Sequence, residues 1–216
     1  MIGELEFILK TAQSLIRQRK LAPAETLLLD KYKKWGNHPL INLALGEIFF
    51  LKDNIATSLQ YLKIAYESGK NIPSVVVYYA EKLRLNDETT RAKEVLQIAI
   101  LNRPCDKGLL ESYANFCLTD QNPLESLKFN FRLLLLFPNY STGHTNIAEA
   151  YAALDNYEKS LEHQSIAIKY DTGSQVKLNR AITLLTLEKY QEGWAEYENR
   201  IGYDIISSTR RRLRVP

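Results

Sequence analysis

The sequence of 216 residues is long enough for one domain of ordinary size, or one extended array, with a substantial core. Its 45% hydrophobic and 25% charged residues are typical of a soluble globular protein and exclude a largely disordered chain. Four arginines near the end, Arg210, Arg211, Arg212 and Arg214, account for the formal net charge of +3, so that residues 1–209 carry −1. This distribution disfavours a folded basic face of the kind that follows nucleic-acid phosphates.

The start of the chain and its cysteines bear on where the protein resides. MIGELEFILK mixes acidic and apolar residues and lacks the basic and then apolar regions of a signal peptide. The longest apolar runs, such as LLLLF at 133–137, are too short to cross a bilayer. Cys105 and Cys117 form neither a CxxC motif nor a disulfide framework. We therefore expect a cytoplasmic protein with reduced thiols.

A period of 34 residues runs along the chain from Leu5. It defines units at 5–38, 39–72, 73–106, 107–140, 141–173 and 174–207. The eighth position of each unit is small: Ala12, Gly46, Ala80, Ala114, Ala148 and Ala181. The twentieth position is also small: Ala24, Ser58, Ala92, Ser126, Ser160 and Gly193. Two helices approach closely only where no bulky side chain stands between them, so these columns predict a pair of antiparallel helices in each unit.

Breaks in the helical pattern agree with two helices per unit. Short polar turns divide the units at 52–54 (KDN), 85–89 (LNDET), 119–123 (TDQNP) and 154–156 (LDN). Prolines separate one unit from the next, at Pro39, Pro73, Pro104 and Pro138. The sequence therefore predicts an all-α array over residues 1–207, followed by a basic tail or linker at 208–216.

This layout resembles the tetratricopeptide repeat family, whose repeats have 34 residues with small eighth and twentieth positions. The resemblance includes an alanine near the twenty-seventh position, at Ala65, Ala99 and Ala167, and a proline at the thirty-second, at Pro104 and Pro138. It implies a right-handed superhelical solenoid of about six helix-turn-helix repeats. The first unit departs from the pattern, with Lys31 and Gly36 in these two places, and the fourth unit has Leu133 in place of the alanine.

The sequence offers no constellation suited to catalysis. His38 lies in the first unit and His144 and His163 lie in the fifth, and the three form no HxH, HExxH or Cys–His pair. Neither GxGxxG nor a Walker-type motif occurs. We therefore expect no catalytic residues, no metal, no cofactor and no enzymatic activity.

The family resemblance implies a concave surface lined by the first helix of each repeat and suited to an extended peptide or a helix. In this family the second, fifth, sixth, ninth, twelfth and thirteenth positions of that helix commonly point inward. The groove residues expected on this basis are Glu47, Tyr78, Glu81, Arg84, Glu111, Asn115, Asn146, Glu149 and Asn179. For any one of them, a solvated surface without a ligand is an equal alternative.

Two features of this lining bear on the ligand. No lysine or arginine occupies a fifth position and only Lys10 occupies a sixth, so the pattern of carboxylate-clamp repeats that bind chaperone C-termini is missing.

Asn146 and Asn179 hold equivalent sixth positions in consecutive repeats, which resembles the asparagine ladder of the O-GlcNAc transferase superhelix. Asparagine offers a donor and an acceptor to a peptide backbone. Tyr78 and Ser112 interrupt the column, so a coincidence of two residues is the alternative.

Aromatic residues occur together at the end of the sixth unit, where Trp194 and Tyr197 can share one helix face. The surrounding segment is similar to the one that closes the repeat region in bacterial proteins where such an array precedes a glycosyltransferase domain. The residues that carry this similarity are Asn179, Ala181, Leu184, Leu185, Gly193, Trp194, Tyr197, Glu198 and Arg200. Asn199 departs from it, because an aromatic residue often stands there. The similarity implies a docking face formed by Trp194, Tyr197 and Arg200.

From the sequence we expect a non-catalytic module that binds a protein or peptide, as the N-terminal acceptor- or partner-binding region of a larger bacterial glycosyltransferase-type protein. The alternative is a free-standing adaptor that scaffolds a cytoplasmic complex through the same groove. The expected partners are a protein or peptide in the groove and, at the C-terminal face, a downstream domain or a second copy of the chain. Neither nucleic acid nor a membrane span is expected.

Overall fold

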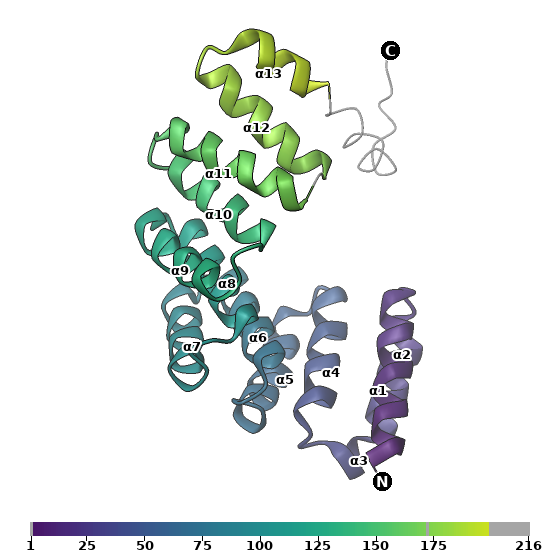
Figure 1. The fold of residues 1–216 in the computed structure, drawn as a ribbon. Helices are drawn as coiled ribbons and strands as arrows, with labels where there is room; N and C mark the ends of the chain where they lie inside the picture. Colours follow the sequence, from purple (N-terminus) through teal and green to yellow (C-terminus); the bar gives the residue numbers. More distant parts are fainter. Residues whose placement is uncertain (1, 172, 199–216) are drawn as a thin grey trace, which may run out of the picture. The chain divides into compact units, whose positions relative to one another are not determined.

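The computed structural model describes residues 2–171 and 173–198, and within them it is all helical, with no strand (Figure 1). The expected all-α fold is confirmed. The helices are α1 (Ile2–Arg17), α2 (Leu21–Asp30), α3 (Tyr32–Trp35), α4 (Pro39–Leu51), α5 (Ile55–Ser68), α6 (Pro73–Leu85), α7 (Thr89–Asn102), α8 (Lys107–Thr119), α9 (Pro123–Leu136), α10 (Ser141–Ala152), α11 (Tyr157–Tyr170), α12 (Ser174–Thr186) and α13 (Tyr190–Tyr197).

The helices belong to two compact bodies, an N-terminal body up to Leu109 and a C-terminal body from Leu110. In the N-terminal body, α1 packs on α2, α4 on α5 and α6 on α7, and α2 and α5 also contact the helix that opens the next pair. In the C-terminal body, α10 packs on α11 and α12 on α13, while α9 contacts α10 and α11 contacts α12. Tyr113 connects α8 to α9, because its hydroxyl donates to Glu125 Oε1 at 2.8 Å. Each body is therefore a stack of helical hairpins.

The small residues of the eighth and twentieth positions all lie buried, in all six repeats. At Gly46, an added Cβ would lie 2.5 Å from Leu62 Cδ2, and at Gly193 it would lie 2.7 Å from Leu185 Cδ2. Ser58 meets Gly46 from the other helix of the same hairpin, and its hydroxyl donates to the Gly46 carbonyl at 2.7 Å. The twelve small positions are thus where the paired helices come closest, and larger side chains would force them apart.

The first helix of every repeat ends with the same backbone geometry. The fifteenth residue of each repeat has a positive φ of 54–61°: Arg19, Asp53, Asp87, Gln121, Asp155 and Glu188. In all six repeats the next residue donates its backbone N–H to the carbonyl of the eleventh residue, at 2.8–2.9 Å. This is the Schellman motif, in which glycine usually takes the left-handed position because other L-residues are strained there. None of the six repeats has glycine at this position.

The residue that follows the left-handed position also starts the second helix. In three repeats it is an asparagine, Asn54, Asn122 or Asn156, whose side-chain oxygen accepts a backbone N–H three residues on. One residue therefore closes the first helix with its backbone and caps the second with its side chain. In these three repeats, the double use explains how the hairpin turns within three or four residues.

The first repeat contains an additional helical turn, where the sequence predicted only two helices. Its second helix ends at Asp30, and Tyr32–Trp35 form the separate turn α3. The break falls at Lys31, which replaces an alanine that is at most 5% exposed in other repeats, as at Ala65 and Ala99. A lysine ammonium cannot be buried in that contact without a partner. Lys31 is half-buried, with its Nζ 2.7 Å from Asp30 Oδ2.

The left-handed turn positions give a stability prediction. Replacing Gln121 by glycine should stabilise the C-terminal body by about 0.5–1 kcal/mol, because relief of backbone strain outweighs the larger entropy of the unfolded chain. Replacing Gln121 by valine should destabilise the body, because a β-branched side chain resists this conformation. Thermal and urea unfolding of both variants checks the signs. Two variants with equal stability would contradict the role of strain at this turn.

Candidate functional site

In the N-terminal body, the predicted groove residues lie on α4 and α6, the first helices of the second and third repeats. Glu47 on α4 is half-buried, and this burial raises the pKa of its carboxyl although the charges of Lys82 and Arg17 oppose the shift. Burial also raises the pKa of the Tyr78 hydroxyl on α6, and the carboxylates of Glu47 and Glu81 add to that shift. These three predicted residues therefore interact electrostatically across neighbouring repeats.

Lys82 lies in the same cluster as Glu47, Tyr78 and Glu81, although the sequence pattern did not predict it. Its side chain is buried, at 7% exposure, and its Nζ lies 3.8 Å from the centre of the Phe50 ring and 4.6 Å from that of Tyr78. Glu81 Oε1 lies 3.4 Å from the same Nζ. The ammonium is thus held by two aromatic faces and a carboxylate. Lys82 is the tenth residue of its repeat, a position that is not among the inward positions of the family. The aromatic residues Phe50 and Tyr78 were the only signal in the sequence that could have pointed to it.

In the C-terminal body, the predicted groove residues lie on α8, α10 and α12. Asn146 on α10 is buried and donates through Nδ2 to Asn115 Oδ1 on α8, at 2.7 Å. Glu111 on α8 accepts from the Tyr140 hydroxyl at 2.9 Å, just before α10 begins. Polar contacts therefore link the first helix of the fourth repeat to that of the fifth.

The other predicted groove residues have separate surroundings. Asn179 on α12 is half-buried and accepts through Oδ1 from Gln175 of the same helix at 2.7 Å. Burial raises the pKa of the Glu149 carboxyl on α10. Arg84 is half-buried near the end of α6. Asn146 thus already uses its Nδ2 as a donor and Asn179 its Oδ1 as an acceptor, which leaves the Oδ1 of Asn146 and the Nδ2 of Asn179 for a ligand.

The predicted docking face at the end of the chain is described as far as Glu198. The rings of Trp194 and Tyr197 meet edge to face on α13, with centres 5.6 Å apart, and Trp194 is 57% exposed. An ion pair of 2.7 Å between Arg180 on α12 and Glu196 fixes this helix to its neighbour. Arg200 lies outside the described residues, as do the last part of the sixth repeat and the tail at 208–216.

Two histidines 19 residues apart in the sequence meet in the fifth repeat. Nδ1 of His144 on α10 lies 3.1 Å from Nδ1 of His163 on α11, and Nε2 of His144 lies 3.4 Å from the Pro138 carbonyl oxygen. The rings of Phe131 and Tyr151 lie next to His163. A hydrogen bond between the two Nδ1 atoms needs one donor and one acceptor, so the rings cannot both be protonated.

Residues 2–171 and 173–198 contain no group of three or more histidine, cysteine or acidic side chains placed to hold a metal ion. No helix within these ranges is long and apolar enough to cross a membrane.

The repeat geometry agrees with the comparisons to known proteins. No family model matches the chain. The TPR repeat-containing protein YpiA of Bacillus subtilis (strain 168) is 27% identical over 181 residues, which make up 82% of this chain and 41% of that protein. A solved tetratricopeptide repeat protein from Parabacteroides merdae aligns with a TM-score of 0.75 and 16% identity, over 91% of this chain and 78% of that one. This chain has the tetratricopeptide-repeat fold.

The expected resemblance to the tetratricopeptide repeat family is therefore confirmed. YrrB, described as a TPR protein with an unusual peptide-binding site, aligns with a TM-score of 0.60 and 16% identity, over 80% of this chain and 89% of its own. The tetratricopeptide array of this chain spans about two fifths of the length of YpiA.

The histidine pair gives a pH prediction. Burial lowers the pKa of both His144 and His163, so the unfolded chain binds protons that the folded chain excludes. The C-terminal body should therefore lose stability as the pH falls below about 6.5, by about 1.4 kcal/mol for each unit of pKa shift. The nearby charges of Glu162 and Lys159 oppose each other at His163.

Thermal unfolding between pH 7.5 and pH 5, followed by Trp194 fluorescence in a Trp35→Phe background, measures this effect in the C-terminal body. The His163→Phe variant should show a weaker pH dependence, because one titrating group and its partner interaction are gone. His38→Asn, which keeps a capping side chain in the other body, is the matched control and should leave this transition unchanged. An equally steep pH dependence in His163→Phe would contradict the prediction.

Proposed function

We propose that this tetratricopeptide array is a non-catalytic binding module that holds a protein or peptide segment against the first helices of its repeats. The observation that carries the proposal is that, within each body, polar side chains of the first helix of one repeat interact with those of the next. Glu47 and Tyr78 interact across the second and third repeats, and Asn146 Nδ2 donates to Asn115 Oδ1 across the fifth and fourth. A surface that combines fixed acceptors and donors with repeating geometry suits an extended backbone.

The cluster around Lys82 supports the same function in the N-terminal body. Its ammonium is held in place by Phe50, Tyr78 and Glu81, so the surface needs little ordering when a ligand binds. Glu47 and Tyr78 are only partly buried and remain able to bond to a partner. YrrB, a TPR protein with an unusual peptide-binding site, is consistent with such a role for this fold.

We also propose that the array works in the cytoplasm as the partner- or acceptor-binding region of a larger bacterial glycosyltransferase-type protein. The similarity of residues 179–200 to the end of the repeat region in such proteins supports this context, and so does the exposed Trp194 face. The greater length of YpiA is consistent with an array that is one part of a longer protein. A free-standing adaptor that uses the same groove is the second candidate, with a partner or a second copy covering Trp194.

A peptide-binding experiment tests the groove. Binders selected from a displayed random-peptide library should lose about 5- to 10-fold in affinity when Asn146 and Asn179 are both replaced by alanine, because two backbone hydrogen bonds of about 0.5–1.5 kcal/mol each are weakened. Calorimetry with the selected peptides provides the measurement. Asn102→Ala on α7 is a matched control, because that exposed asparagine lies on a second helix. Identical affinities for the wild type and the double variant would exclude an asparagine ladder.

The C-terminal face is tested separately. Trp194→Ala should weaken docking of the downstream domain of the natural protein, while the circular dichroism of the repeats stays helical, because the exposed ring contributes little to the core. Docking can be measured by titrating the separately produced downstream region into the array. Tyr190→Ala, which removes an equally exposed aromatic residue at the start of α13, distinguishes a specific site from general apolar contact. Unchanged docking in Trp194→Ala would favour the adaptor.

A further inference from the structure

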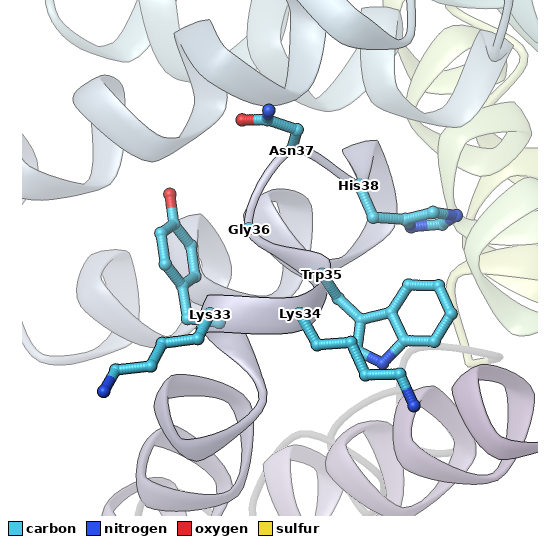
Figure 2. A pocket seen from close by; sticks show the side chains of 7 residues that line it. Lys33, Lys34, Trp35, Gly36, Asn37 and His38 are labelled. Carbon is cyan, nitrogen blue, oxygen red and sulfur yellow. The ribbon is translucent and has the colours of Figure 1, made fainter.

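The turn that contains α3 forms a cavity on the N-terminal body, away from the predicted groove residues of α4 and α6. Seven consecutive residues, Tyr32 to His38, line this cavity of about 430 Å³ (Figure 2). In Figure 2, the Trp35 indole and the His38 ring lie on one side of the turn and the Lys33 side chain extends to the other. The cavity lies at the turn that follows the helix break at Lys31.

Buried contacts fix the shape of this turn. Asn42 is fully buried on α4 and donates through Nδ2 to the carbonyls of Gly36 at 2.5 Å and His38 at 3.1 Å. Its Oδ1 accepts from the Tyr32 hydroxyl at 3.2 Å. A Cβ on Gly36 would lie 2.7 Å from the Tyr32 carbonyl oxygen, so only glycine fits beneath that ring. The turn is therefore preformed, which lowers the cost of binding a ligand.

The cavity continues along α5. A second cavity of about 260 Å³ shares Tyr32 with the first, and a third of about 820 Å³ shares Asn37. Together they follow one stripe of the helix, at Thr57, Gln60, Tyr61, Ile64 and Ser68, over a length of about 16 Å. We call this surface the α3–α5 groove. Its floor is apolar, because Ile64 is 39% exposed and the Tyr61 ring stacks on Phe49 behind it.

Positively charged side chains outnumber negatively charged ones in the lining of the α3–α5 groove. Lys33 and Lys63 line it, and neither has a carboxylate within 4 Å among the described residues. Its one lining carboxylate, Glu67, is already paired with Lys70 at 2.8 Å, which lowers the pKa of that carboxyl, and the charge of Lys63 adds to the shift without an ion pair. Lys34 is likewise paired, with Glu4 at 2.6 Å. The free charge of the groove is therefore positive, while its floor is apolar.

We propose that the α3–α5 groove is a second docking site, which takes a partner segment with large apolar side chains between carboxylates. The apolar side chains lie on Ile64 and Tyr61, and the carboxylates pair with Lys33 and Lys63. The arginine-rich end of this chain has the wrong charge to be the occupant. The site uses no residue of the predicted groove on α4 and α6, so it does not depend on the function proposed above.

Three labelled dodecapeptides test the proposal on the full chain. The first alternates aspartate and glutamate with leucine and phenylalanine, the second replaces the apolar residues by serine, and the third replaces the acidic residues by lysine. Fluorescence anisotropy should show the first peptide binding at least 10-fold more tightly than either of the others. In a Trp194→Phe background, the emission of Trp35 should change on binding, because Trp35 lines the cavity.

Variants then locate the site. Ile64→Ser and the pair Lys33→Glu with Lys63→Glu should each weaken the acidic apolar peptide at least 10-fold. Leu101→Ser, which removes a leucine that is 82% exposed on α7, and Lys128→Glu on α9 are matched controls and should bind as the wild type does. Preference for the basic peptide, equal binding of all three, absence of binding, or equal losses in the control variants would each overturn the proposal. Concentration-dependent self-association lost in Ile64→Ser would instead assign the groove to a second copy and overturn the peptide occupant.

Discussion

The close approach of two helices at small residues is the constraint on which every hairpin of this protein depends. Twelve positions in six repeats hold alanine, serine or glycine, and all of them are buried. Where the residue is glycine, as at Gly46 and Gly193, a single added carbon would overlap a leucine. Because the two helices of each hairpin meet at these small residues, larger side chains pack on either side of the contact. The inward faces of the first helices are then positioned by the backbone and can vary in chemistry.

Much of this architecture could be predicted from the sequence, because the small residues that recur every 34 positions mark the contact between two paired helices. The small columns identified the paired helices, and the tetratricopeptide fold followed from them. The left-handed residues of the turns could not be found in this way, since Arg19, Asp53 and Gln121 share no chemistry. Their common property is a backbone angle, which side-chain patterns do not reveal when glycine is absent.

The candidate sites were predicted less completely, and the reason is different. Inward positions inferred from the family located Glu47, Tyr78 and Asn146, but the family pattern says nothing of which neighbours they contact. Lys82 was not predicted, because a charged residue at the tenth position is expected to be solvated. In the structure, two aromatic rings shield it from water. The departure at Lys31 was visible in the sequence, yet its result, an extra helical turn and a groove beside α5, required knowledge of the surrounding packing. Contacts between distant residues decide such features, and a single sequence does not contain them directly.

The six turns with left-handed residues have a further consequence for the surface of the protein. The turn needs only a backbone angle from its fifteenth residue, so that side chain is released from packing and can point to water. Four of the six residues are acidic, Asp53, Asp87, Asp155 and Glu188, and one, Arg19, is basic. Five of the six turns therefore place a charged side chain at the surface, and the turn at Gln121 places a neutral one there. In neighbouring repeats of one body these turn residues include like charges, Asp53 with Asp87 and Asp155 with Glu188, and like charges repel a second array that approaches in the same register.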